Sequence, residues 1–133
     1  MDDLVDWLRA QLDEDKRIAQ AATWCDDAAT WRAAVSEYGT PARPGGPRWY
    51  VEDSMEDGVV TTVDPQASAD EGVALHIAEH DPARVLREID AKRRVLNTLH
   101  EEGGDRMFAD IFHLLALPYA DRPGYRQEWA PTP

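Results

Sequence analysis

The sequence predicts an α+β fold, in which residues 1–133 form a mainly helical single domain with four to five helices and one small β-hairpin. Apolar residues recur at helical spacing over most of the chain, and two short β-rich segments flank an Asp-Gly pair. The 133 residues are 43% hydrophobic and 30% charged, which is typical of a globular domain that buries a core without disulfides or metal.

A first amphipathic helix is predicted over residues 3–22. Asp2 and Asp3 lie at its start, where the helix macrodipole favours negative charge. Asp13 and Arg17 have the spacing of an i,i+4 ion pair. The apolar positions that recur at steps of three and four are Leu4, Val5, Leu8, Leu12, Ala19 and Ala22.

A second helix is predicted over residues 26–38, after a break near Cys25. Apolar and aromatic side chains again follow at steps of four and three, and Gly39 is a suitable helix stop. These side chains belong to Trp24, Ala28, Trp31, Val35 and Tyr38. We expect this aromatic stripe in the core, with a partner-binding face as the alternative. The spacing leaves open whether the helices over 3–22 and 26–38 are continuous.

A loop and then a hairpin are predicted in the middle of the chain. Residues 39–47 contain three prolines and three glycines, which suit neither helix nor strand. Residues 48–51 and 59–63 are rich in β-branched and aromatic side chains, and Asp57-Gly58 is a turn signal between them. A hairpin edge, where exposed, would offer a site for dimerisation or strand addition.

Three helices are predicted in the second half. Ser68 and Glu71 match a capping box for a short helix over residues 69–79. Asp81 and Pro82 then end that helix and begin the next, because Asp caps free N–H groups and Pro suits the first helical position. This helix should run to Glu102.

Gly103-Gly104 ends the long helix, and Asp105 can cap a further one. The apolar residues of that last helix are Phe108, Ile111, Phe112 and Leu115. Residues 118–133 contain four prolines and three aromatic residues. We expect them to form an extended C-terminal arm that packs back on the body.

The net charge of −12 is unevenly distributed. Residues 1–81 hold 18 acidic and 6 basic residues, whereas residues 82–133 hold 8 of each. Such a field disfavours direct binding to nucleic acid or to anionic membranes. A solvated acidic face is the simplest interpretation, and an acidic DNA mimic that inhibits a basic nucleic-acid-binding protein is an alternative.

Composition also bears on the compartment and on the chemistry. Cys25 is the only cysteine, so no internal disulfide forms, and we expect a cytoplasmic protein. Asp26 and Asp27 beside it disfavour the reactive thiolate. No nucleophile-elbow serine and no phosphate-binding loop is present, so the sequence favours a non-enzymatic protein with no cofactor.

Two clusters are candidate sites. His76 and His80 are four residues apart on one predicted helix, the spacing of helical zinc ligands, although the His-Glu-x-x-His pattern is absent. Arg84, Arg87 and Arg94 share a face of the long helix. They could bind a phosphate or carboxylate, or be neutralised within the fold, or meet the acidic face of another copy.

The segment from His76 to Arg93, with its His-Ile-Ala-x-His-Asp-Pro-Ala-Arg-Val-Leu-Arg motif, resembles a family of small uncharacterised actinobacterial proteins, some carried by their phages. Residues 2–9 and 119–129 are similar to that family too. The resemblance implies a cytoplasmic protein of unknown function and supplies no catalytic residues. Our leading hypothesis is a small interaction or regulatory module that binds a protein partner or self-associates. The alternative is a metal-binding enzyme or sensor that uses His76 and His80.

Overall fold

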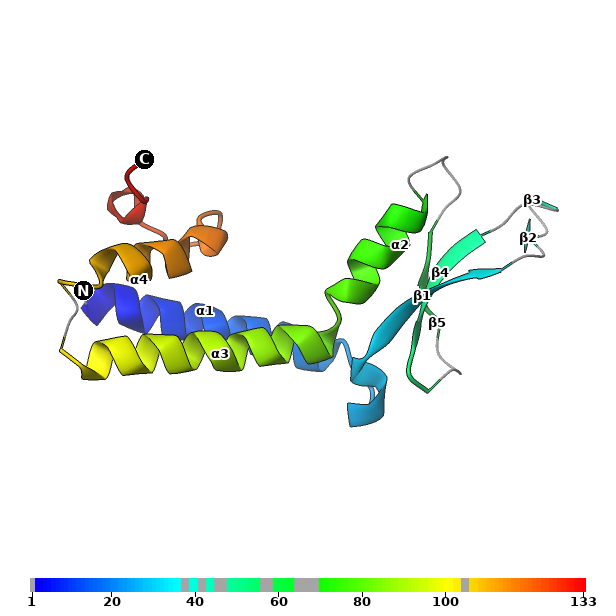
Figure 1. Cartoon of the computed structure of the whole chain (residues 1–133), viewed down its shortest axis with the longest axis horizontal. Helices are drawn as coiled ribbons and strands as arrows, with labels where there is room; N and C mark the ends of the chain where they lie inside the picture. Colours follow the sequence, from blue (N-terminus) through cyan, green and yellow to red (C-terminus); the bar gives the residue numbers. More distant parts are fainter. Residues whose placement is uncertain are drawn as a thin grey trace. The chain divides into compact units, whose positions relative to one another are not determined.

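The computed structural model describes residues 2–36, 39–40, 43–44, 48–55, 59–63, 70–103 and 106–133. Its elements in chain order are α1 (Asp2–Ala21), η1 (Asp26–Ala29), β1 (Trp31–Ser36), β2 (Gly39–Thr40), β3 (Arg43–Pro44), β4 (Arg48–Asp53), β5 (Val59–Thr62), α2 (Asp70–Glu79), α3 (Pro82–Glu101), α4 (Ala109–Ala116), η2 (Leu117–Tyr119) and η3 (Gln127–Trp129) (Figure 1). In this part of the chain, four α-helices accompany a three-stranded antiparallel sheet, which confirms the α+β class.

The chain divides into two compact units. The first, here called the helical unit, consists of Met1–Arg17 and Arg87–Pro133. The second, the sheet unit, consists of Ile18–Leu86. Each unit has its own core, and the two are described separately.

The core of the helical unit is built on the apolar stripe of α1. Leu4, Val5, Leu8 and Leu12 are at most 2% exposed, as the periodicity predicts. Side chains of α3, α4 and the C-terminal segment complete this core: Ile89, Leu96, Phe112, Ala116, Tyr119 and Trp129.

Polar contacts connect α1 with α3 at the rim of this core. Asp13 accepts a hydrogen bond from Arg93, and the Arg9 guanidinium donates to Asn97 (3.2 Å). The predicted pair of Asp13 with Arg17 is wrong, because Arg17 pairs with Glu14 instead. Asp13 instead pairs with Arg93 of α3, a partner that is distant in the sequence.

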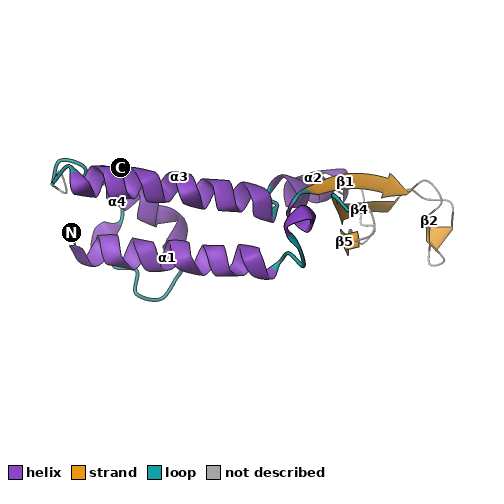
Figure 2. Ribbon diagram, turned by 90° about the horizontal axis from the view of Figure 1, so that it is seen from below, coloured by secondary structure: helices purple, strands orange, loops and turns teal. Residues whose placement is uncertain are grey.

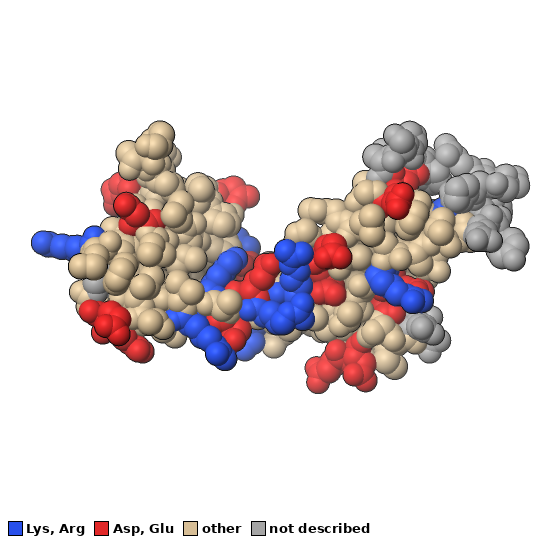
Figure 3. Space-filling view, viewed as in Figure 1, with Lys and Arg blue, Asp and Glu red and all other residues tan. Residues whose placement is uncertain are grey.

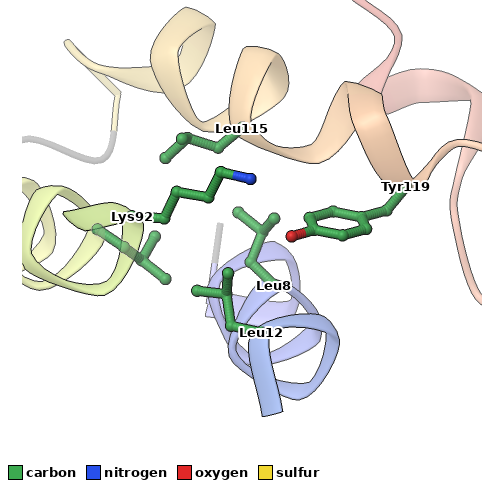
Figure 4. Close-up of a pocket in the computed structure, with 6 residues that line it drawn as sticks. Leu8, Leu12, Lys92, Leu115 and Tyr119 are labelled. Carbon is green, nitrogen blue, oxygen red and sulfur yellow. The ribbon is translucent and has the colours of Figure 1, made fainter. Parts of the chain in front are cut away.

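A small cavity lies within the helical unit, lined by Leu8, Leu12, Leu96, Leu115, Lys92 and Tyr119 (Figure 4). Figure 4 shows the Lys92 chain among the leucines. Its Nζ lies 5.8 Å from the Tyr119 ring centroid, within range of a cation–π interaction. The methylene groups of Lys92 therefore cover apolar surface while the ammonium keeps a favourable electrostatic contact.

The C-terminal segment returns to α1 through the Trp7 ring. The Trp7 centroid lies 5.3 Å from that of Trp129 and 5.8 Å from that of Tyr125, and its Nε1–H donates to the carbonyl of Pro123 (3.2 Å). Gly124, which lies between Pro123 and Tyr125, has φ of 87°, and a Cβ at this residue would lie 2.7 Å from Trp7 Nε1. Only glycine fits both this backbone conformation and this close approach.

The sheet unit contains a sheet of order β1-β4-β5 (Figure 2). β4 and β5 pair antiparallel, which confirms the predicted hairpin, whereas its Asp57-Gly58 turn lies outside the described residues. The helix predicted over residues 26–38 is wrong. α1 ends at Ala21, η1 covers four residues, and β1 pairs with β4 from Trp31↔Asp53 to Ser36↔Arg48.

One face of the sheet is covered by α2. Val51, Val63, Ala74 and Ala78 form the buried cluster, and the partly buried residues Trp31, Ala33, Trp49 and Ile77 pack against it. Trp31, Ala33 and Val35 alternate along β1, so a spacing of four between Trp31 and Val35 fits a strand as well as a helix. Pairing with β4 decides between the two. Ser68 of the predicted capping box lies outside the described residues.

The junction between α2 and α3 depends on the buried carboxylate of Asp81. Its Oδ1 accepts the backbone N–H of Arg84 (2.8 Å), which confirms the predicted N-cap before Pro82. Its Oδ2 accepts the backbone N–H of Trp31 at the start of β1 (3.0 Å). The Asp81 side chain therefore binds both the first turn of α3 and the first residue of β1.

Replacing Asp81 should destabilise the sheet unit strongly. Asp81→Ala removes the cap and leaves the Trp31 N–H without its acceptor, so we expect the free energy of unfolding to fall by about 2–3 kcal/mol. Urea unfolding followed by circular dichroism measures the change. The control is Asp90→Ala, whose exposed carboxylate pairs with Arg94 one turn away (3.0 Å) and should cost about 0.5 kcal/mol or less. Equal losses in the two variants would contradict the role of Asp81.

Gly124 and Gly72 should respond to alanine with opposite signs. Gly124→Ala places a methyl group against Trp7 at positive φ, so we expect a loss of about 1–3 kcal/mol in unfolding free energy. Gly72 lies in α2, where no atom lies within 4 Å of the position that a Cβ would take, so Gly72→Ala should stabilise by about 0.5–1 kcal/mol. Thermal unfolding of both variants beside the wild type tests this. A neutral Gly124→Ala variant would show that the contact with Trp7 is unimportant.

Candidate interaction surface

The two candidate metal ligands lie side by side, His76 in the last turn of α2 and His80 directly after its end. The ring centroids of His76 and His80 are 4.4 Å apart, and both side chains are exposed. His80 Nδ1 donates to the carbonyl of His76 (2.8 Å), because a carbonyl oxygen can only accept. This leaves His80 Nε2 as the nitrogen able to face a metal. Among the residues that the structure describes, no group of three His, Cys, Asp or Glu side chains is placed to hold a metal ion.

The three candidate arginines are placed along α3 and have different surroundings. The guanidinium of Arg84 donates to the carbonyl of Glu79 (3.2 Å), and Arg94 pairs with Asp90 (3.0 Å). Arg87 is exposed and has no ion pair with any described residue. The side chain that reaches across to α1 is Arg93, which was not among the candidate residues.

A polar network in the helical unit surrounds the buried Tyr119. Its hydroxyl donates to Asp15 (2.6 Å), and Arg122 pairs with the same carboxylate and lies 4.7 Å from the Tyr119 ring. Burial, with the hydrogen bond and charge of Asp15, raises the pKa of the Tyr119 phenol well above its usual value. The phenol therefore stays neutral and acts as a structural donor rather than a base.

The most distinctive surface is on α4. Its inner face is buried through Phe112 and Ala116, but Ile111, Leu114 and Leu117 on the outer side are 39%, 56% and 46% exposed. Met107, just before the helix, is 82% exposed. Ile111 and Leu114 are three residues apart in α4 and so lie on neighbouring positions of its outer side, and Met107 lies in the turn that precedes the helix. We call Met107, Ile111, Leu114 and Leu117 the α4 stripe.

The surroundings of the α4 stripe contain few charges. In Figure 3 the surface over α4 and the segment after it is mostly uncharged. Leu114 also borders a groove of about 190 Å³ with Asp110, His113, Pro131 and Thr132. An apolar stripe beside a small polar groove is the usual composition of an interface centre and its rim.

Ile111 is one of the apolar residues expected in the last helix, and its side chain is 39% exposed. The sequence signal for this exposure is the composition of residues 111–117, Ile-Phe-His-Leu-Leu-Ala-Leu, which holds more apolar residues than one buried helix face accommodates. Within the described chain, only the inner side of α4 is covered. The same part of the chain contains no helix with the length and apolar content needed to cross a membrane.

Comparison with known proteins finds one family-level match. The model of DUF6221, a family of unknown function, matches residues 1–131. No protein of curated function and no solved structure matches the chain. The match is to an uncharacterised family, as the resemblance of the central and terminal motifs implied.

The raised pKa of Tyr119 predicts a loss of stability at alkaline pH. A folded pKa above the unfolded value of about 10 contributes stability that is complete below pH 10 and is lost as the pH rises above it. The unfolding free energy of the wild type should therefore fall above about pH 10. Tyr119→Phe should be less stable by about 1–2 kcal/mol at neutral pH, and this difference should shrink as the pH rises. Urea unfolding from pH 7 to about pH 11 measures both curves, and parallel curves would contradict the assignment.

Proposed function

The chain belongs to DUF6221, a family of unknown function, and we propose that it is a small protein-interaction module that binds a second copy of itself through the α4 stripe. The observation that carries the proposal is the exposure of this helix. Ile111, Leu114 and Leu117 are 39%, 56% and 46% exposed beside Asp110, and the described chain covers only the inner side of α4.

The energetic argument concerns exposed side chains. Burying a leucine or isoleucine that is open to water contributes about 1.5–3 kcal/mol when complete, and Ile111, Leu114 and Leu117 start about half exposed. Met107 adds a flexible side chain that fits irregular surfaces. Exposed apolar residues gathered on one face commonly mark a binding surface.

Charge favours a second copy as the occupant of this surface. The helical unit holds 14 acidic and 10 basic residues, whereas the sheet unit holds 12 and 4. A contact between helical units therefore brings together weakly charged surfaces. Arg106 and Asp110, of opposite sign, are exposed at the start of α4. In a two-fold symmetric contact each can face a group of opposite sign on the other copy.

We further propose a cytoplasmic location. Its support is the lone Cys25, which is usual in proteins of reducing compartments.

The second candidate function is metal binding at His76 and His80. The observation that favours it is the 4.4 Å distance between the ring centroids of His76, in α2, and His80, directly after α2. A two-imidazole site would need further ligands from water or from another chain.

The self-association of the wild type should be lost when the α4 stripe becomes polar. We expect a dimer at protein concentrations between about 1 µM and 1 mM, which corresponds to roughly −8 to −4 kcal/mol, and a monomer for the Ile111→Asn/Leu114→Asn variant. The control is Val73→Asn/Leu75→Asn, which changes two residues of α2 that are 44% and 46% exposed. Sedimentation equilibrium and native mass spectrometry measure the subunit number.

A wild type that is monomeric throughout this range would overturn the proposal, as would a dimer that survives the α4 substitutions. The same native mass spectra test the second candidate. A stoichiometric metal mass that disappears in His76→Ala supports it, and a metal-free protein contradicts it.

A further inference from the structure

We propose that the outer edge of β1 accepts an extended, basic segment of a partner protein as an additional strand of the sheet. This inference goes beyond the α4 contact, because β1 belongs to the sheet unit and α4 to the helical unit. It rests on the hydrogen-bond pattern of β1 and on the charge of the sheet unit.

β1 is the more regular of the two edge strands. Its six residues pair with β4 without a break, from Trp31↔Asp53 to Ser36↔Arg48. β5, on the opposite edge, has four residues, and its register shifts between Val51 and Glu52. Irregularities of this kind bend an edge away from further pairing. β1 has no such protection along its length.

The register decides which backbone groups of β1 point outward. The carbonyl of Trp49 accepts the N–H of Val63 (3.0 Å), so the backbone groups of Trp49 face β5. Its partner on β1, Val35, therefore belongs to a pair without hydrogen bonds to β4. By alternation, Trp31, Ala33 and Val35 direct their N–H and C=O groups away from β4.

Two hydrogen bonds at the start of β1 agree with this assignment. Thr30 directly precedes Trp31, so its backbone groups point to the opposite side of the strand. Its carbonyl accepts the N–H of Ser54 on the β4 side (2.9 Å). The N–H of Trp31 points the other way and donates to Asp81 Oδ2 (3.0 Å). The Asp81 carboxylate thus occupies the place of a carbonyl on an added strand. It sets the point where pairing along this edge must stop.

The N–H and C=O groups of Ala33 and Val35 form the open part of the edge. In the described chain, no residue outside the sheet bonds to them. Ala33, Ala34 and Ser36 carry small side chains, and Val35 is 40% exposed, so another backbone can approach to the usual strand spacing of about 4.8 Å. Figure 2 shows β1 as the outermost strand of the three.

The charge of the sheet unit indicates the chemistry of the occupant. With 12 acidic against 4 basic residues, this unit attracts a basic segment and repels a second copy of itself. Main-chain hydrogen bonds would supply the pairing, and lysine or arginine side chains would supply the attraction. A short strand addition of this kind forms a weak, reversible complex.

The test uses a short peptide that alternates lysine and valine, and the same peptide with N-methyl groups on alternate residues. The methylated form keeps its charge but cannot donate hydrogen bonds along one edge. We expect the unmethylated peptide to shift the amide resonances of Ala33 and Val35 and to slow their hydrogen exchange. We expect the methylated peptide to bind at least about 10-fold more weakly.

Substitutions at Val35 provide the matched pair of variants. Val35→Pro removes an outward N–H, which an edge strand tolerates, and should weaken binding of the unmethylated peptide at least about 10-fold. Val35→Thr keeps the N–H and should bind like the wild type. Circular dichroism of both variants verifies that the sheet is retained.

Three results would overturn the proposal. Equal binding of the two peptides would mean charge attraction only. Unshifted Ala33 and Val35 amides at saturating peptide would place any binding elsewhere. A dimer that Val35→Pro abolishes, and that the α4 substitutions leave intact, would make a second copy the occupant, and this result would also overturn the proposed function. A monomeric wild type that still binds the unmethylated peptide at Ala33 and Val35 would overturn the proposed function alone.

Discussion

The carboxylate of Asp81 is the interaction on which the sheet unit depends. It is 8% exposed, and its two oxygens accept one N–H from the first turn of α3 and one from the first residue of β1. The same contact sets the break between α2 and α3 and anchors the strand that pairs with β4. The register with β4 leaves the backbone groups of Ala33 and Val35 at an unshared edge, and the bond from Trp31 to Asp81 closes the start of that edge. Asp81 thus limits how far an added strand could pair along β1.

The helical unit is organised by contacts between the two ends of the chain. Trp7 of α1 holds the segment around Gly124, and Asp15 holds Tyr119 and Arg122. These contacts tie the C-terminal segment to one side of α1, and the inner face of α4 is buried in the same core. α4 therefore packs on this core with its outer side open. An apolar surface on a helix that is already packed needs less ordering on binding than a segment that must first fold.

The two proposed surfaces differ in chemistry as well as in position along the chain. The α4 stripe is apolar and belongs to the less charged unit, whereas the β1 edge offers backbone groups in the strongly acidic unit. Attraction of a basic segment to the β1 edge weakens as ionic strength rises, whereas apolar burial at the α4 stripe is not screened in this way. Binding at different salt concentrations therefore distinguishes the two contacts.

Features that arise between near neighbours in the chain are predictable from the residues alone. The stripe of α1 repeats every three or four residues, and Asp81 caps a helix that starts one residue later, so both were predicted correctly. Only the tertiary structure decided the state of residues 31–36 and the exposure of Ile111. Trp31 and Val35 fit a helix or a strand equally well, and pairing with β4, which is distant in the sequence, selects the strand. α4 holds more apolar residues than one buried face accommodates, and packing against α1 and α3 decides which side remains exposed. Near-neighbour hydrogen bonds are encoded locally, whereas pairing and burial depend on residues that folding alone brings together.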